Sequence, residues 1–203
     1  MGRTSDARER LLEAMLELIW VGSFGTTSVD HICERAEVKK GSFYHFFESK
    51  HALAMAAIEH GWEEFRKTLD DAFSASRPPV ERLECWIRHL RDEQVQMHVK
   101  HGRVLGCPIH TLGTEVGPMD DLFQKVLKGK LAQYLRYLET AIRDAHAEGV
   151  VHAPEASVKA KILFSYSEGL LAHARIWNDL SILDSLESGM RDILRLDDSL
   201  VVA

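Results

Sequence analysis

The segment 39–50 combines the side chains that proteins use to bind nucleic acid. It reads Lys-Lys-Gly-Ser-Phe-Tyr-His-Phe-Phe-Glu-Ser-Lys. At the spacing of a helix its phenylalanines share one face, which leaves the lysine, serine, tyrosine and histidine side chains on the other. Such side chains contact phosphates and base edges of a duplex. Gly41, near the start of this helix, removes a side chain where the backbone could approach a phosphate.

The positive charge of this segment is local. The whole chain has 25 Lys and Arg, 31 Asp and Glu, and a net charge of -6, which by itself favours neither nucleic acid nor a membrane surface. Residues 39–51 nevertheless contain three lysines and one acidic residue. A few phosphate contacts suffice to make binding steeply dependent on salt, because each contact releases condensed counterions.

Two short helices and a turn must position this segment. Apolar residues at helical spacing between Leu11 and Trp20 predict a first helix that Gly22 ends. Thr27 with Asp30 fits a capping box, which predicts a second, short helix. The third covers residues 39–47. This spacing is typical of a helix-turn-helix unit.

The remainder of the chain is also predicted to be helical. A long helix runs from a cap at Ser49 to about Phe73, and further helices cover 80–100, 122–149, the residues after Pro154, and 186–194. The glycine- and proline-rich stretch 102–118 should be broken around one short helix. No strand alternation of useful length occurs. The fold class is therefore all-α, a three-helix head followed by a helical bundle, with about nine helices.

Length and composition support a folded protein of the reducing compartment. The 203 residues are 45% hydrophobic, which is enough for a core. No apolar run is long enough to span a membrane, and the polar N-terminus does not resemble a secretory signal. The three cysteines are far apart in the sequence, which argues against a disulfide framework. We expect a soluble, cytoplasmic protein without a membrane partner.

The segment TTSVDHICERAEVKKGSFYHFFESKHAL, residues 26–53, resembles the DNA-binding signature of the TetR family of transcriptional regulators. The resemblance implies a DNA-binding domain at 1–50, an effector-binding and dimerisation domain at 51–203, and a homodimer. It implies phosphate contacts from Thr27, Ser28, Tyr44 and Lys50. It also implies major-groove or flanking contacts from Lys39, Lys40, Ser42 and His45, beside the backbone at Gly41. The turn position that usually holds glycine in the family is Glu37 here, so the resemblance implies that Glu37 must accept a left-handed backbone or shift the turn.

The broken stretch 102–118 is the predicted wall of an effector site, because interrupted helices leave concave surface. Its Gly-Cys segment resembles that of TetR-like repressors that respond to electrophiles or oxidants through a cysteine, which would make Cys107 the sensor. Arg103 and His110 lie close in sequence, and positive charge favours a thiolate. Trp86 and Tyr134 are candidate aromatic lining. The alternative is that Cys107 is a small buried hydrophobe, as free cysteines usually are.

The last helices predict a partner, since they carry more apolar surface than one helix pair needs. The candidate residues of a four-helix dimer interface are Ile162, Tyr166, Leu170, His173, Met190 and Ile193. Two recognition helices about 34 Å apart would then enter successive major grooves of a pseudo-palindromic operator. We therefore predict a DNA-binding transcriptional regulator that acts as a repressor. A small-molecule ligand or modification of Cys107 would release it from its operator.

Other functions are also open at this point. An all-helical enzyme could use Cys107 and a histidine as nucleophile and base, but no oxyanion or cofactor motif accompanies them. A protein-interaction module could keep a helix-turn-helix shape. His98 and His101 with Cys107 or His110 could bind a metal, although no tight cluster stands out. We therefore predict no enzyme activity, no cofactor and no metal.

Overall fold

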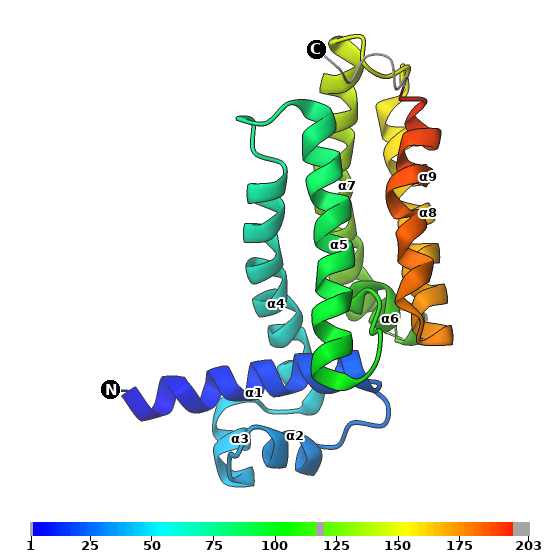
Figure 1. Cartoon of the computed structure of the whole chain (residues 1–203). Coiled ribbons are helices and arrows are strands. Elements are labelled where there is room, and N and C mark those ends of the chain that lie inside the picture. Colours follow the sequence, from blue (N-terminus) through cyan, green and yellow to red (C-terminus); the bar gives the residue numbers. More distant parts are fainter. Residues whose placement is uncertain (1, 117–119, 197–203) are drawn as a thin grey trace. The chain divides into compact units, whose positions relative to one another are not determined.

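The computed structural model describes residues 2–116 and 120–196, with side chains from residue 6 onward. Over this part of the chain the elements are all helices, and the expected all-α class with nine α-helices is confirmed. The helices are α1 Gly2–Val21, α2 Val29–Arg35, α3 Lys40–Phe46, α4 Lys50–Ala72, α5 Pro79–His101, α6 Pro108–Glu115, α7 Asp121–Ala147, α8 Ala156–Trp177 and α9 Ser185–Leu194. A short 3-10 helix, η1 Leu180–Asp184, precedes α9 (Figure 1).

The chain forms two compact units. The first contains residues 1–67 and 108–127, and the second contains residues 68–107 and 128–203. The long helices α4 and α7 contribute residues to both units. The predicted DNA-binding domain, residues 1–50, lies wholly inside the first unit, whereas α6 joins that unit from far along the sequence. The functional boundary at residue 50 stays a prediction.

The first unit is held together by one apolar cluster to which α1, α2, α3 and α4 each contribute. Leu11, Met15, Ile32, Phe43 and Leu53 are all completely buried in it. Full burial of such side chains stabilises the unit by about 1.5–3 kcal/mol each. These are the apolar positions whose spacing predicted the helices, and their burial fixes which face of α3 remains outside.

The helix ends differ in detail from the sequence prediction. Ser28, not Thr27, caps α2: its Oγ accepts a hydrogen bond from the backbone N–H of His31 at 3.1 Å. The capping-box assignment to Thr27 was wrong by one residue, because both residues precede the helix and either hydroxyl could serve. At α4 the cap was correct, and Ser49 Oγ accepts from the N–H of Ala52 at 3.0 Å. Pro154 lies before α8 and not inside it.

The turn between α2 and α3 contains a left-handed residue, the first of the two alternatives given for Glu37. Glu37 has φ 53°, a region that favours glycine. We expect Glu37→Gly to raise the free energy of unfolding of the first unit by about 1 kcal/mol, because it removes that backbone strain. Urea unfolding followed by circular dichroism measures the change. The matched control is Glu34→Gly inside α2, which should lower stability by about 1 kcal/mol; equal shifts in both variants would contradict the prediction.

The second unit is a bundle in which α5, α7, α8 and α9 bury a separate core (Figure 1). Leu83, Leu138, Leu163 and Met190, one from each of these helices, are completely buried. Helices α8 and α9 approach closely at Gly189. A Cβ built there would lie 2.0 Å from the Tyr166 hydroxyl, so a side chain at this position would require the tyrosine ring to move. Tyr166 lies across this glycine and donates its hydroxyl proton to the carbonyl oxygen of Ser185 at 2.7 Å.

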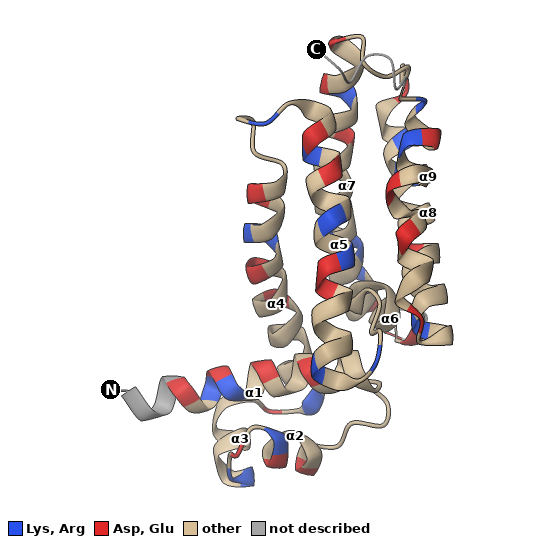
Figure 2. Ribbon diagram, in the orientation of Figure 1, with Lys and Arg blue, Asp and Glu red and all other residues tan. Residues whose placement is uncertain are grey.

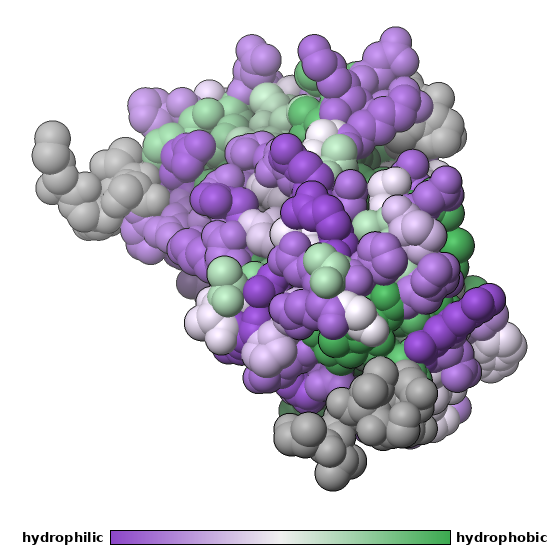
Figure 3. Space-filling view, turned by 90° about the horizontal axis from the view of Figure 1, so that it is seen from above, coloured by the Kyte–Doolittle hydropathy of each residue, from purple (hydrophilic) through white to green (hydrophobic). Residues whose placement is uncertain are grey.

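Among the described helices, none is long and apolar enough to cross a membrane. On the face shown in Figure 3, hydrophilic residues cover most of the surface and apolar side chains are visible between them. The large apolar side chains that remain exposed on α8 are Val158, Ile162, Ile176 and Trp177. All four lie on α8, which therefore carries an exposed apolar surface.

Candidate nucleic-acid interface and effector site

Helix α3 presents the polar face that the sequence predicted. Phe43 is completely buried and anchors the helix. The rings of Phe43 and Tyr44 pack edge to face, with their centroids 5.1 Å apart. Tyr44 itself is 55% exposed, which is high for an aromatic side chain. Of the other predicted contacts on this segment, Ser42 is half-buried and the exposed ones are Lys39, Lys40, Gly41 and His45. The described surface of α3 is thus polar and accessible.

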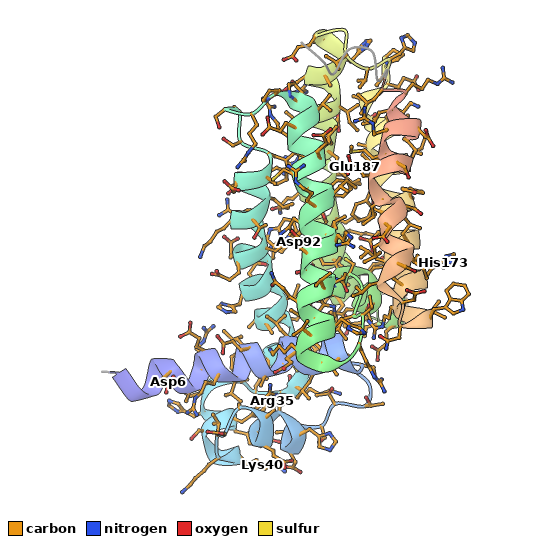
Figure 4. All side chains as sticks on the ribbon, in the orientation of Figure 1. Asp6, Arg35, Lys40, Asp92, His173 and Glu187 are labelled. Atoms are coloured by element: carbon orange, nitrogen blue, oxygen red, sulfur yellow. The ribbon has the colours of Figure 1, made fainter. Side chains whose placement is uncertain are left out.

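Some of the cationic side chains of the first three helices form ion pairs with acidic residues. Lys40 Nζ lies 2.8 Å from Asp30 Oδ1 on α2, and this hydrogen bond raises the pKa of Lys40. Arg35 of α2 pairs with Glu17 of α1. Figure 2 shows blue and red residues interspersed along α1 to α3, and Figure 4 labels Lys40 and Arg35 on their helices. DNA must therefore compete with Asp30 for the ammonium group of Lys40.

We expect Asp30→Asn to tighten binding to DNA of any sequence by a few fold, because it frees Lys40 and removes a negative charge beside α3. The stability change should be small, under about 1 kcal/mol, since the pair is exposed. Fluorescence anisotropy with unrelated duplexes at several salt concentrations measures the effect. A matched control is Asp121→Asn, an exposed acid at the start of α7. Unchanged affinity in Asp30→Asn would contradict the prediction.

The other predicted phosphate contacts have roles inside the protein that the sequence did not reveal. Thr27 is 5% exposed and donates its hydroxyl proton to Ser23 O at 2.7 Å. Lys50 Nζ donates to the carbonyl oxygens of Phe24 and Thr27 at 2.8 and 2.9 Å, and lies 4.1 Å from the centre of the Phe24 ring. Burial lowers the pKa of Lys50. Together with the Ser28 cap, these groups hold the loop between α1 and α2, and their contact with phosphate stays a prediction.

Glu115 is a structural residue of the first unit that sequence reasoning missed. Its carboxylate, at the end of α6, accepts hydrogen bonds from the backbone N–H groups of Phe24 at 3.0 Å and Gly25 at 2.7 Å. In the same unit His51 Nε2 lies 2.8 Å from Asp120 Oδ2. Pairs separated by 69 to 91 residues leave no local signal in one sequence, so only the fold shows them. They fasten α6 and the start of α7 to the loop and to α4.

In the second unit, the segment before Cys107 is fastened by polar side chains. Gln94 is 1% exposed. Its Oε1 accepts hydrogen bonds from the backbone N–H groups of Leu105 at 3.0 Å and Gly106 at 2.8 Å. Its Nε2 donates a hydrogen bond to the carbonyl oxygen of Gly106 at 3.2 Å. Arg175 donates to Leu105 O at 2.8 Å. Gly106 has φ 68°, where glycine is favoured. The N–H and carbonyl groups of Leu105 and Gly106, directly before Cys107, are thus all hydrogen-bonded to side chains.

Side chains from three helices gather near Cys107. Trp86 of α5 donates its indole N–H to the Tyr134 hydroxyl of α7 at 2.7 Å, and both residues are buried. Glu168 of α8 is 7% exposed and is hydrogen-bonded to the Cys107 side chain. Burial raises the pKa of Glu168 to about 7 against the lowering effect of that bond. Burial also raises the pKa of Tyr134 well above its ordinary value, with Cys107, Glu168 and Glu93 adding to the rise.

The structure brings together part of the predicted effector set. Trp86, Tyr134 and Cys107 share one neighbourhood, whereas Arg103 and His110 are both exposed. The titratable group hydrogen-bonded to Cys107 is the carboxyl of Glu168, a residue that the sequence analysis did not select. Among the residues that the structure describes, no group of three His, Cys, Asp or Glu could hold a metal ion.

The predicted dimer residues divide between surface and core. Ile162 is 47% exposed, and His173 is exposed and extends outward from α8 (Figure 4). Tyr166, Leu170 and Ile193 are half-buried. Met190 is completely buried within the protomer, so it cannot contact a second copy directly and can only pack beneath the residues that do. The exposed apolar residues Val158, Ile176 and Trp177, which were not selected from the sequence, lie on α8 as well.

A short helix pair with an exposed polar second helix, in an all-helical chain, defines a helix-turn-helix DNA-binding protein. Comparison with known proteins agrees. Residues 11–57 match the family described as "Bacterial regulatory proteins, tetR family". The transcriptional regulator AcuR of Cereibacter sphaeroides is 34% identical, over 76% of this chain and 70% of AcuR. The transcriptional repressor NemR of Escherichia coli K12 is 24% identical, over 93% of this chain and 94% of NemR.

Solved structures give the same result. The regulatory protein TetR from Rhodobacter sphaeroides has a TM-score of 0.83 and 30% identity, covering 92% of this chain and 98% of that one. The reduced form of Escherichia coli NemR has a TM-score of 0.79 at 20% identity, covering 95% and 99%, which shows the shared fold. The chain belongs to the TetR family and is a DNA-binding transcriptional regulator. These relatives are regulators, not enzymes.

Proposed function

We propose that the protein is a homodimeric repressor that binds a pseudo-palindromic operator through α3, and that a small-molecule ligand or modification of Cys107 releases it. The observation that carries the DNA-binding part is α3 itself, where a buried Phe43 supports an exposed Tyr44. Tyr44 contacts the Phe43 ring but leaves more than half of its own side chain exposed, beside the exposed Lys40 and His45. It suits phosphate and base contacts in a major groove.

The exposed residues of α8 support the dimer. Val158, Ile162, Ile176 and Trp177 are 44%, 47%, 74% and 65% exposed, although large apolar side chains are usually buried. Contact with the same helices of a second copy would cover them and form a four-helix interface. A dimer also matches the operator, because two copies of α3 can then bind two half-sites.

The neighbourhood of Cys107, Trp86 and Tyr134 supports the release step. An effector that binds or modifies this place must favour the form with low operator affinity. Moving the protein from mostly bound to mostly released requires a preference of about 10⁴-fold. Buried aromatic and polar side chains can supply such a preference, because adding bulk in a packed core forces another packing. We propose no catalytic activity for the protein.

Binding to a fragment of its own upstream DNA, measured by fluorescence anisotropy between low and high salt, tests the proposed function. We expect sequence-selective binding that weakens steeply with salt. Release is then tested with N-ethylmaleimide on wild type, Cys107→Ser and the control Cys85→Ser. We expect release in wild type and in Cys85→Ser only. Equal release in all three proteins would remove Cys107 from the mechanism, and failure to prefer any upstream sequence would overturn the operator proposal.

A further inference from the structure

Two oppositely charged side chains hold the backbone of the loop between α1 and α2. Glu115, the last residue of α6, accepts hydrogen bonds from the N–H groups of Phe24 at 3.0 Å and Gly25 at 2.7 Å, one on each carboxylate oxygen. Lys50, the first residue of α4, donates to the carbonyl oxygens of Phe24 and Thr27 at 2.8 and 2.9 Å. Two helices outside the loop therefore satisfy four backbone groups between residues 24 and 27.

The position of Glu115 is unfavourable for its own helix. An acid at the C-terminal end of a helix lies beside the negative end of the helix dipole. The surroundings of the carboxylate compensate for this. Gly25 has no side chain where the carboxylate approaches, since a Cβ built there would lie 3.2 Å from Glu115 Oε1. Burial lowers the pKa of Lys50, and the negative charge of Glu115 opposes that lowering. The acid is thus placed to hold the loop and not to stabilise α6.

The ring of Phe24 is held as well as its backbone. Lys50 Nζ lies 4.1 Å from the centre of the ring. Phe123 of α7, which is completely buried, packs edge to face against it with centroids 5.3 Å apart. Glu115 and Phe123 both belong to residues 108–127, which join the first unit from far along the sequence. The predicted DNA-binding domain, residues 1–50, therefore lacks part of the set of side chains that fixes this loop.

We propose that Glu115 is a positioning residue for operator binding, which fixes the loop between α1 and α2 so that Thr27 and Ser28 can contact the phosphates. The segment 108–127 then belongs to the part of the protein that reads DNA, although it lies within the predicted effector domain. This inference rests on the proposed operator binding. It adds a residue that acts on DNA only through the loop, because a carboxylate itself repels phosphates.

The direction of the effect separates positioning from a simple effect of charge. Removing an acid from a DNA-binding unit raises the affinity for any duplex, because the phosphates are repelled less. Removing a positioning residue lowers the affinity for the operator, because the loop then occupies conformations that cannot bind. Glu115→Gln should therefore weaken operator binding while binding to unrelated DNA stays equal or becomes slightly tighter.

The test uses the full-length protein and fluorescence anisotropy with two duplexes of equal length, the upstream operator fragment and an unrelated sequence. Glu115→Gln keeps the size of the side chain but turns an NH₂ group toward one of the two backbone N–H groups. Glu115→Ala removes both acceptors. Hydrogen exchange followed by NMR reports the amides of Phe24 and Gly25.

Two control variants lie on the same helix. Thr114→Ala removes a neighbouring hydroxyl that donates to the carbonyl oxygens of His110 and Thr111 within α6. Leu112→Ala removes a buried apolar side chain, 3% exposed, and lowers stability without removing a hydrogen bond of the loop. Urea unfolding ranks the stability of all variants, and the binding experiments use conditions in which each one is folded.

We expect both Glu115 variants to bind the operator roughly tenfold more weakly, the loss for a dimer in which each loop is competent about a third of the time. The amides of Phe24 and Gly25 should exchange roughly ten- to a hundredfold faster, since a hydrogen bond to a charged group changes an equilibrium by about that factor. Thr114→Ala should match wild type. Leu112→Ala should unfold at lower urea than Glu115→Gln and still bind the operator like wild type.

Operator affinity in Glu115→Gln that equals or exceeds that of wild type would overturn the inference. So would an equal loss with both duplexes, or a loss that Leu112→Ala shares, because either result would show only a general role in stability. The proposed function fails in a different way, namely if the wild-type protein does not distinguish the operator fragment from the unrelated duplex.

Discussion

Tyr44→Ala is expected to weaken binding to the operator by about 10²-fold while the free protein stays folded. Tyr44 is 55% exposed on α3, so its removal leaves the core formed around Phe43 in place. A dimer loses the tyrosine contact in both half-sites, and each lost contact is worth about 1–3 kcal/mol. Fluorescence anisotropy with the operator fragment at fixed salt measures the loss, and thermal unfolding checks the fold.

Two further variants separate the kinds of contact. Tyr44→Phe removes only the hydroxyl and should lose less affinity than Tyr44→Ala. Lys39→Ala should lower affinity for all sequences alike and reduce the slope of log affinity against log salt by about 1 per protomer. The charge control is Lys125→Ala, an exposed lysine of α7, which should leave the slope unchanged. If Tyr44→Ala binds as tightly as wild type, α3 is not the surface that faces the groove.

Gln94→Ala is expected to lower the free energy of unfolding of the second unit by about 3–5 kcal/mol. The side chain satisfies three backbone groups, the N–H of Leu105 and both the N–H and the carbonyl of Gly106, where water has little access. Losing a hydrogen bond to a buried backbone group costs about 1–3 kcal/mol. Since most domains are stable by only about 5–15 kcal/mol, this single change approaches the whole margin. Urea unfolding followed by circular dichroism measures it.

The matched control for this prediction is Gln96→Ala, an exposed glutamine two residues further along α5. It should change stability by less than about 0.5 kcal/mol. Gln94→Glu keeps an oxygen for the two N–H groups but loses the donor to Gly106 O, so it should lie between alanine and wild type near neutral pH. Similar unfolding midpoints for Gln94→Ala and Gln96→Ala would show that the segment before Cys107 does not depend on this side chain.

The helices and the polar face of α3 were predictable from one sequence because both depend on local spacing. Apolar residues three and four apart define a buried face, and Phe43 follows that rule in α3. The left-handed backbone at Glu37 is one of the two outcomes that the family resemblance implied for a non-glycine residue in this turn. The capping of α2 was displaced by one residue because neighbouring hydroxyls are equivalent in a sequence and differ only in the geometry of the loop.

The surroundings of Cys107 were beyond sequence reasoning for a physical reason. Proximity along the chain suggested Arg103 and His110, but a helix directs successive side chains to different sides and a turn changes direction again. The group that contacts the thiol, Glu168, comes from a helix about sixty residues later in the chain. The same holds for Glu115 and the loop at Phe24. Contacts of this kind depend on packing between helices, which one sequence does not encode in any local pattern.

Gly189 also affects the register in which α9 packs against α8. Because Tyr166 occupies the space that a side chain would need, moving α9 by one residue would bring Ser188 or Met190 against the ring, and the ring would have to move aside. The glycine therefore favours the present register of α9 on α8. A dimer that uses these helices would inherit that register from each protomer.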